Sequence, residues 1–329
     1  AGCNNVASGI NSLVLNGESN SASGSCSVIA NGNNNIVNGI NGSILNGSSN
    51  TVHSSSCGGF IASGNSNILC CGVNNVIISG CSNTSIGNFN SIVNGQNSCV
   101  NGSQSTIVNG CNNKINATRS LIASGENHCI SGNNSSIVSG NSNTLSGSNA
   151  SISSGNCNTV SGCNSSISSG NCNTVSGCNS SISSGNCNTV SGCNASISSG
   201  DCNIVSGSGS TIVAGKQNSV TSNCAGVLTG SSNTVCSDFG SIIAGCNNLV
   251  QGIHSGIGVG INNIISGSTG FIAAGENNWI LSNSSFVAAG SGNKIAAGAN
   301  YSAVLAGLSN CLSANASQSF ISSGKNNLI

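Results

Sequence analysis

Proline is absent from the chain, and so is methionine. Because proline cannot donate to a ladder of backbone hydrogen bonds, its absence fits a chain in which nearly every N–H group feeds such a ladder. Charged residues make up 3% of the chain and aromatic residues 2%. The low charge excludes an ordinary disordered chain, and the shortage of large side chains excludes an ordinary globular core. Since methionine is missing, we expect the sequence to be a processed form or a fragment.

The scarcity of charge also limits the possible partners and chemistry. The net charge is zero and the five basic residues are scattered, so we expect no nucleic-acid surface. No apolar run approaches the roughly 18–20 residues of a membrane helix. Acidic residues and histidines lie far apart, and no Cys-x-x-Cys pair occurs, so we expect no catalytic site, metal or cofactor. The 20 cysteines favour an oxidising, extracellular location.

Glycine, asparagine and serine dominate the chain in a 15-residue repeat that is nearly perfect over residues 151–206. In one copy, residues 158–162 alternate like a strand, Cys163 and Asn164 form a corner, and residues 165–169 form a second strand. This pattern predicts an all-β, parallel two-sheet β-solenoid with about 15 residues per coil and about 22 coils. We expect one continuous domain over residues 1–329, a rod roughly 100 Å long at about 4.8 Å per coil.

Three residue columns recur at the repeat spacing. One aliphatic per strand, such as Val160 and Ile167, predicts a thin core. A buried asparagine ladder, with each side-chain amide donating to the carbonyl of the next coil, is expected at Asn143, Asn158, Asn173, Asn188, Asn203 and Asn218. Corners with positive φ, or too tight for a Cβ atom, are expected at Gly155, Gly170, Gly185, Gly200 and Gly215. Insertions near residues 53–59 and 70–76, and two after Ile295, predict bulged corners.

The motif NTVSGCNSSISSGNC resembles the repeats of ryegrass-type ice-binding proteins, whose coils carry Asn-x-Val-x-Gly and Asn-x-Val-x-x-Gly halves. The likeness extends over essentially the whole chain. It implies a left-handed β-roll with an internal asparagine ladder. A weaker likeness, carried by residues 270–275, is to the β-roll heads of trimeric autotransporter adhesins.

Ice binding needs a flat, regular, outward array, and threonine follows the ladder asparagine in several coils. The candidate ice face is formed by Thr144, Thr159, Thr174 and Thr189. Bulky or charged residues interrupt this row elsewhere, at Ile36, Lys114, Ile204, Trp279 and Lys294. The opposite strand presents a flat Ser-x-Ser surface over residues 151–198, which lacks the threonine methyl groups. A solvated strand surface without a ligand is the alternative interpretation of both faces.

Other columns suggest cross-links and contacts. Stacked cysteines predict coil-to-coil disulfides such as Cys157–Cys172 and Cys163–Cys178, and Cys187 and Cys202 continue the first of these columns. N-glycosylation sequons occur at corners, and the candidate sites are Asn41, Asn134, Asn149, Asn164, Asn179 and Asn194. Phe271, Phe286 and Phe320 recur at one outward position, which suggests a contact surface or a row covered by an inserted corner.

These features support three hypotheses for function. The leading one is a secreted, non-enzymatic fibre subunit whose uncapped ends stack head to tail with other copies. In that hypothesis the cysteine columns cross-link the fibre and glycans decorate its corners. The alternative is an ice-binding protein that uses its flat serine and threonine faces. An adhesin or surface stalk is the third.

Overall fold

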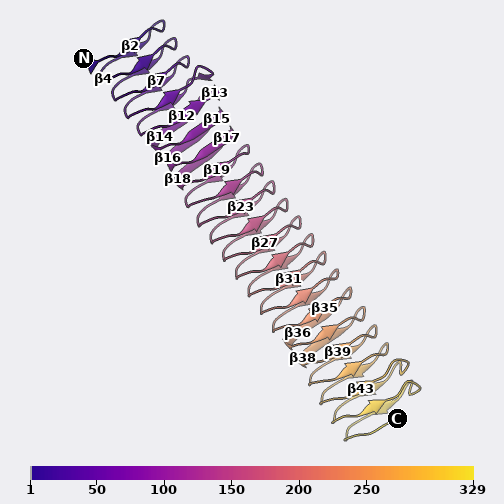
Figure 1. The fold of residues 1–329 in the computed structure, drawn as a ribbon. Coiled ribbons are helices and arrows are strands. Elements are labelled where there is room, and N and C mark those ends of the chain that lie inside the picture. The colour runs from indigo at the N-terminus through magenta and orange to yellow at the C-terminus, as the bar shows by residue number, and fades with distance from the viewer. Residues whose placement is uncertain (1) are drawn as a thin grey trace. The chain divides into compact units, whose positions relative to one another are not determined.

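A computed structural model describes residues 2–329, and every regular element in that range is a β-strand. The chain forms about 21 coils of about 15 residues, which confirms the predicted parallel two-sheet β-solenoid. It divides into two compact units, Ala1–Asn164 and Ser165–Ile329. Within each unit, successive coils lie side by side (Figure 1). No helix in the described range is long and apolar enough to cross a membrane. A single continuous domain stays a prediction.

Each coil gives one short strand to each of two parallel sheets. The first sheet holds the strands that follow the ladder asparagine, and the second sheet holds the strands that follow the next corner. Strands pair with the coil one repeat away, so that Thr174 lies opposite Thr189 and Ser181 opposite Ser196. A third line of contact consists mostly of single-residue bridges, such as Asn171 to Asn186.

The strands of the unit Ala1–Asn164 follow this alternation. Its first sheet contains β2 (Val6–Ala7), β5 (Ser21–Ala22), β7 (Ile36–Val37), β9 (Thr51–Val52), β12 (Ile68–Cys70), β15 (Thr84–Asn88), β17 (Cys99–Ser103), β19 (Lys114–Ile115), β21 (Cys129–Ile130), β23 (Thr144–Leu145) and β25 (Thr159–Val160). Its second sheet contains β3 (Leu13–Val14), β6 (Val28–Ile29), β8 (Ser43–Ile44), β11 (Phe60–Ile61), β14 (Val76–Cys81), β16 (Ser91–Gln96), β18 (Thr106–Cys111), β20 (Leu121–Ile122), β22 (Ser136–Ile137) and β24 (Ser151–Ile152). Two further pairs lie at corners, β1 (Gly2–Cys3) with β4 (Gly17–Glu18) and β10 (Ser56–Cys57) with β13 (Gly72–Val73).

The unit Ser165–Ile329 has the same organisation. Its first sheet contains β27 (Thr174–Val175), β29 (Thr189–Val190), β31 (Ile204–Val205), β33 (Ser219–Val220), β35 (Thr234–Val235), β37 (Leu249–Val250), β39 (Ile264–Ile265), β41 (Trp279–Ile280), β43 (Lys294–Ile295) and β45 (Cys311–Leu312). Its second sheet contains β26 (Ser166–Ile167), β28 (Ser181–Ile182), β30 (Ser196–Ile197), β32 (Thr211–Ile212), β34 (Gly226–Val227), β36 (Ser241–Cys246), β38 (Gly256–Ile261), β40 (Phe271–Ile272), β42 (Phe286–Val287), β44 (Ala303–Val304) and β46 (Phe320–Ile321).

The core is as thin as the repeat predicts. Typically one aliphatic side chain from each sheet enters it per coil, for example Val190 and Ile197, both with no exposed surface, and Ser85 takes the aliphatic position in one coil. Because side chains alternate along a strand, the preceding residues Thr189 and Ser196 point outward. Each sheet therefore presents one row of residues to the core and another to the solvent.

The predicted asparagine ladder is present, and the bonds between asparagine side chains run to the preceding coil instead of the next one. Asn203 Nδ2 donates to Asn188 Oδ1 of the preceding coil at 3.1 Å, and the Asn203 backbone N–H donates to the same oxygen at 2.9 Å. The remaining amide hydrogen reaches forward to the Gly215 carbonyl at 2.8 Å. One asparagine thus satisfies groups in three consecutive coils, which keeps buried polar atoms paired in a core with few apolar atoms.

A second internal ladder, of serines, was not predicted. Ser180 Oγ donates to the Gly192 carbonyl at 2.7 Å and accepts from the Ala195 backbone N–H at 3.1 Å. Ser135 makes the equivalent bonds to Gly147 and Ala150 in the other unit. In the sequence, this ladder corresponds to a small residue directly before the second strand. Such a residue is equally typical of a polar corner.

The corners explain the glycine and asparagine columns. Gly185 has φ 116°, and a Cβ atom there would lie 2.0 Å from the Gly200 carbonyl oxygen. Glycine is therefore required by both conformation and space. Asn194 occupies the other corner with φ 54°, in the left-handed region that asparagine tolerates better than most residues.

Candidate functional site

The Thr face is the outward surface of the first sheet where threonine follows the ladder asparagine. In the unit Ser165–Ile329, Thr174 and Thr189 lie opposite each other on β27 and β29. In the unit Ala1–Asn164, Thr144 and Thr159 do the same on β23 and β25. Neighbouring threonines of a pair are separated by the strand spacing of about 4.8 Å.

A row of serines runs beside these threonines. Ser176 and Ser191 follow two residues after Thr174 and Thr189 and are exposed, as are Ser146 and Ser161 in the other unit. In this row the sequence pattern predicted a role for the threonines alone. The serines could have been found from the alternation in Asn-Thr-Val-Ser, because the residue after the buried valine points outward again.

The backbone under the Thr face is firmly held. The Thr174 N–H donates to the Asn188 carbonyl at 2.8 Å, and the Ser176 N–H donates to the Val190 carbonyl at 2.8 Å. Directly before each threonine stands a ladder asparagine with no more than 1% exposure. Threonine also has a restricted χ1 angle. The hydroxyl and methyl groups are therefore held in a regular array.

Larger residues bound the array. Lys114 lies on the same row next to Cys99, and burial raises the pKa of the Cys99 thiol while Lys114 opposes that shift. Towards the other end of the chain, the Lys294 ammonium lies 5.8 Å from the centroid of the Trp279 ring. These side chains project beyond a threonine. Within the unit Ser165–Ile329, Ile204 follows Thr189 on the same row, so Thr174 and Thr189 form its flat part there.

The second sheet presents a Ser face opposite. Ser166, Ser181 and Ser196 form an unbroken row that ends at Thr211, and the hydroxyls of Ser196 and Thr211 lie 3.1 Å apart. This row is as regular as the Thr face in its backbone register. It lacks methyl groups, which makes it a matched polar control on the same coils.

A sequence model described as the grass antifreeze beta roll matches residues 70–168, 115–198 and 160–268. Together these matches cover more than half of the chain. The chain belongs to the grass antifreeze beta roll family. None of the curated proteins compared with it matches.

Membership of the grass antifreeze beta roll family supports the ice-binding alternative better than the fibre hypothesis that sequence analysis favoured. The fold agrees with the resemblance, since the family is named as a β-roll and the structure is a parallel β-solenoid. Among residues 2–329, no group of three or more His, Cys, Asp or Glu side chains is placed to hold a metal ion.

The remaining candidate residues of this β-roll lie on its surface. Cys157, Cys163, Cys172, Cys178, Cys187 and Cys202 are all exposed at corners. The coil-to-coil disulfides stay a prediction. The sequon residues are likewise exposed and left-handed, with φ between 54° and 55° at Asn41, Asn134, Asn149, Asn164, Asn179 and Asn194.

The phenylalanines share one outward row of the second sheet, as the repeat spacing predicts. Phe271 lies opposite Phe286, their rings are stacked with centroids 6.2 Å apart, and Phe320 follows beyond Ala303. Phe271 and Phe320 are 41% and 55% exposed, so no inserted corner covers them. A role in contacts remains a hypothesis.

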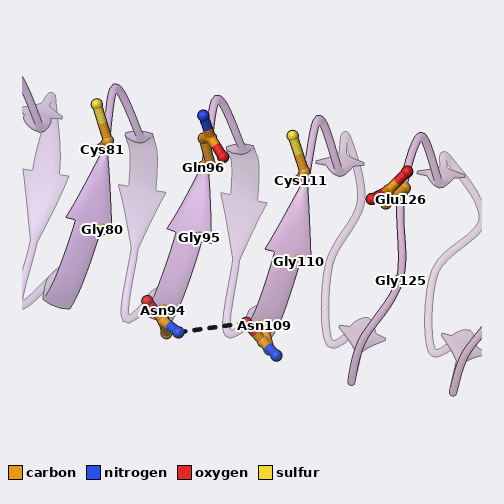
Figure 2. A pocket seen from close by; sticks show the side chains of 10 residues that line it. All are labelled: Gly80, Cys81, Asn94, Gly95, Gln96, Asn109, Gly110, Cys111, Gly125 and Glu126. Atoms are coloured by element: carbon orange, nitrogen blue, oxygen red, sulfur yellow. Dashed lines mark hydrogen bonds between the residues drawn. The ribbon is translucent and has the colours of Figure 1, made fainter.

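The third side of the unit Ala1–Asn164 is hollowed. A cavity of about 640 Å³ is lined by glycine backbone together with Cys81, Asn94, Gln96, Asn109, Cys111 and Glu126. Figure 2 shows Asn94 and Asn109 along one edge, joined by a hydrogen bond of 3.3 Å, and the two thiols along the other. These side chains are amides, thiols and one carboxylate in an open groove, and sequence analysis had assigned none of them a role.

Proposed function

We propose that this β-roll binds ice through the Thr face. The observation that carries the proposal is the repetition of threonine at the coil spacing on a rigid surface, in a member of the grass antifreeze beta roll family. The Ser face has the same backbone spacing but no methyl groups. The combination of methyl and hydroxyl groups therefore distinguishes the proposed binding surface.

The physical reasoning concerns the water above the face. Methyl groups at a regular spacing constrain first-shell water without binding it, and the adjacent hydroxyls anchor the same layer by hydrogen bonds. Since the strand spacing is close to a repeat of the ice lattice, this layer can join the crystal surface. The buried ladder keeps the array in place, so little side-chain or backbone entropy is lost on binding.

The proposal is tested by the double variant Thr174→Tyr, Thr189→Tyr. Both positions lie in one unit and are half-buried against neighbouring coils, so a ring at each would protrude from the plane. We expect thermal hysteresis and ice shaping to be largely lost. The matched control is Ser181→Tyr, Ser196→Tyr, which places the same rings on the Ser face of the same region.

The control should keep its ice activity, and both variants should keep a thermal unfolding midpoint near that of the parent protein. Loss of activity in the serine variant alone would assign ice binding to the Ser face. Full activity in both variants would exclude either face in this region, and no activity in the parent protein would refute ice binding altogether.

Secretion, glycosylation and head-to-tail stacking into a fibre remain hypotheses beside this proposal. An antifreeze role fits an extracellular location, because that is where ice first forms around cells. The exposed sequon corners are compatible with glycans. Ice binding requires neither glycans nor self-assembly.

A further inference from the structure

A widened corner in the unit Ala1–Asn164 holds two cysteines that are adjacent in sequence, Cys70 and Cys71. We propose that this pair is a redox-active dithiol: Cys71 reacts first with an external low-molecular-weight disulfide, and Cys70 then closes a Cys70–Cys71 disulfide. The proposal is independent of ice binding. It identifies a thiol-exchange site away from the threonine rows.

The corner owes its shape to two consecutive insertions. The ladder steps from Asn50 to Asn67 by 17 residues and from Asn67 to Asn83 by 16, instead of the usual 15. The extra residues allow an additional strand pair, β10 with β13, to form across the two coils. A tight turn precedes it, in which the Ser56 N–H donates to the His53 carbonyl at 2.9 Å. The insertions bring His53 and Ser55 beside the two cysteines.

The backbone sets the orientation of the two thiols. Cys70 is the last residue of β12 and pairs with Ile86, whereas Cys71 turns out of the strand with φ 57°. The sulfur atoms lie 3.2 Å apart, within contact distance for a hydrogen bond between a thiol and a thiolate. Cys70 is half-buried and Cys71 is exposed. The exposed sulfur is therefore the one that an external reagent reaches first.

A hydrogen-bonded chain stabilises negative charge on the exposed sulfur. The Ser55 hydroxyl donates to Cys71 Sγ at 3.2 Å, and His53 Nδ1 lies 2.8 Å from Ser55 Oγ. In the Nδ1-protonated tautomer, His53 donates to Ser55 Oγ and leaves the hydroxyl hydrogen of Ser55 for the sulfur. In the other tautomer, Nδ1 accepts the Ser55 backbone N–H at 3.4 Å instead. The hydrogen bond from Ser55, with that from Cys70, lowers the pKa of Cys71. The bond to Cys71, together with burial, raises the pKa of Cys70. The two thiols thus differ as an attacking and a resolving thiol should.

The reaction balances with a disulfide as oxidant. The Cys71 thiolate attacks one sulfur of the external disulfide, a mixed disulfide forms, and the first thiolate departs. The first external thiolate takes up, through solvent, the proton that Cys71 lost on ionisation. Cys70 then attacks the Cys71 sulfur, and its proton passes to the second external thiolate as that group leaves. Two protein thiols and one external disulfide become one protein disulfide and two external thiols. The pair is oxidised and the external disulfide is reduced.

The test uses the full chain, fully reduced, and a substoichiometric amount of oxidised glutathione. Remaining thiols are alkylated at intervals, and each cysteine is followed by mass spectrometry of proteolytic peptides. Cys26 serves as an internal reference, because it is also exposed and left-handed but has Asn11 and Asn41 at the equivalent positions of the adjacent coils. We expect Cys71 to react several-fold faster than Cys26 and to end as a peptide carrying the Cys70–Cys71 bond.

Two variants separate the roles. Cys70→Ser should trap glutathione on Cys71 as a stable mixed disulfide, and Ser55→Ala should slow Cys71 several-fold while leaving the rate at Cys26 unchanged. Equal rates at Cys71 and Cys26 in the parent protein would overturn the proposal. So would a parent protein in which Cys71 retains glutathione or joins Cys57 instead of Cys70.

Discussion

Replacing one ladder asparagine measures what the internal ladder contributes to stability. Asn188 has no exposed surface and takes part in four side-chain hydrogen bonds. In Asn188→Ala, the buried Asn203 N–H loses its acceptor, which costs about 1 to 3 kcal/mol. The other three bonds contribute about 0.5 to 1.5 kcal/mol each. We therefore expect a loss of about 2.5 to 7.5 kcal/mol in the free energy of unfolding.

The chain itself supplies the matched variant, because serine occupies one ladder position. Ser98 Oγ accepts the Asn113 backbone N–H at 3.3 Å and donates to the Gln96 carbonyl at 3.2 Å. Asn188→Ser should accordingly preserve an acceptor for Asn203 and lose about half as much stability as the alanine variant. This comparison isolates the orphaned N–H from the general effect of a smaller side chain.

The assay is denaturant unfolding followed by circular dichroism, combined with hydrogen exchange at the Asn203 amide. Because repeat proteins can unfold in parts, hydrogen exchange gives the local free energy where a single midpoint does not. Equal destabilisation by alanine and serine, or a loss below about 1 kcal/mol for alanine, would refute the argument that the ladder satisfies an otherwise orphaned donor.

Two further predictions concern single positions. Gly185→Ala should destabilise its unit by at least about 2 kcal/mol in a thermal melt, because the residue has φ 116° and the new Cβ atom would lie 2.0 Å from a carbonyl oxygen. The control is Gly226→Ala, which should be close to neutral in the same melt, because Gly226 has no positive φ and the nearest contact of its Cβ atom would be at 3.3 Å. His128 replaces a ladder asparagine, and its Nδ1 atom accepts the Asn143 backbone N–H at 3.2 Å. Its Nε2 atom is buried without a hydrogen-bond partner among the described residues. Burial lowers the pKa of His128 below the ordinary 6.5, and hydrogen bonds with nearby backbone groups oppose that shift only in part. The unfolded chain then binds the proton more readily, so stability should be full above about pH 6.5 and should fall below it. His128→Asn should remove that dependence in denaturant titrations at about pH 7 and about pH 5, and an unchanged dependence would contradict this assignment.

Periodicity predicted the fold because each column has one environment in every coil. The valine and isoleucine columns could be assigned to the core from alternation alone, and the asparagine column to a ladder from its regular recurrence. The serine ladder escaped prediction, since Ala150 and Ala195 interrupt it and a serine beside a corner is compatible with solvent exposure. Composition could not reveal that Ser180 is buried.

The candidate site was less accessible to sequence analysis. Thr174 and Thr189 were placed outward correctly, but threonine on a strand surface is common, and the family match was needed to favour ice as its partner. The dithiol corner was recognised only as an insertion. Its chemistry depends on Ser55 lying beside Cys71 in the next coil, a contact created by the very residues that break the repeat. The repeat predicts the fold, but it does not predict the contacts made by the residues inserted into it.

The one-repeat register of the strands also bears on how such a chain can evolve. Thr189 and Thr174 are paired by contacts that a duplicated coil would make in the same way with its neighbours. Duplicating a whole repeat within the unit Ser165–Ile329 therefore adds a coil without requiring any compensating substitution. A duplication one residue shorter would turn the core residues outward. Recombination between near-identical repeats can therefore lengthen or shorten this surface in whole coils, so the area offered to a ligand is open to selection before any single side chain changes.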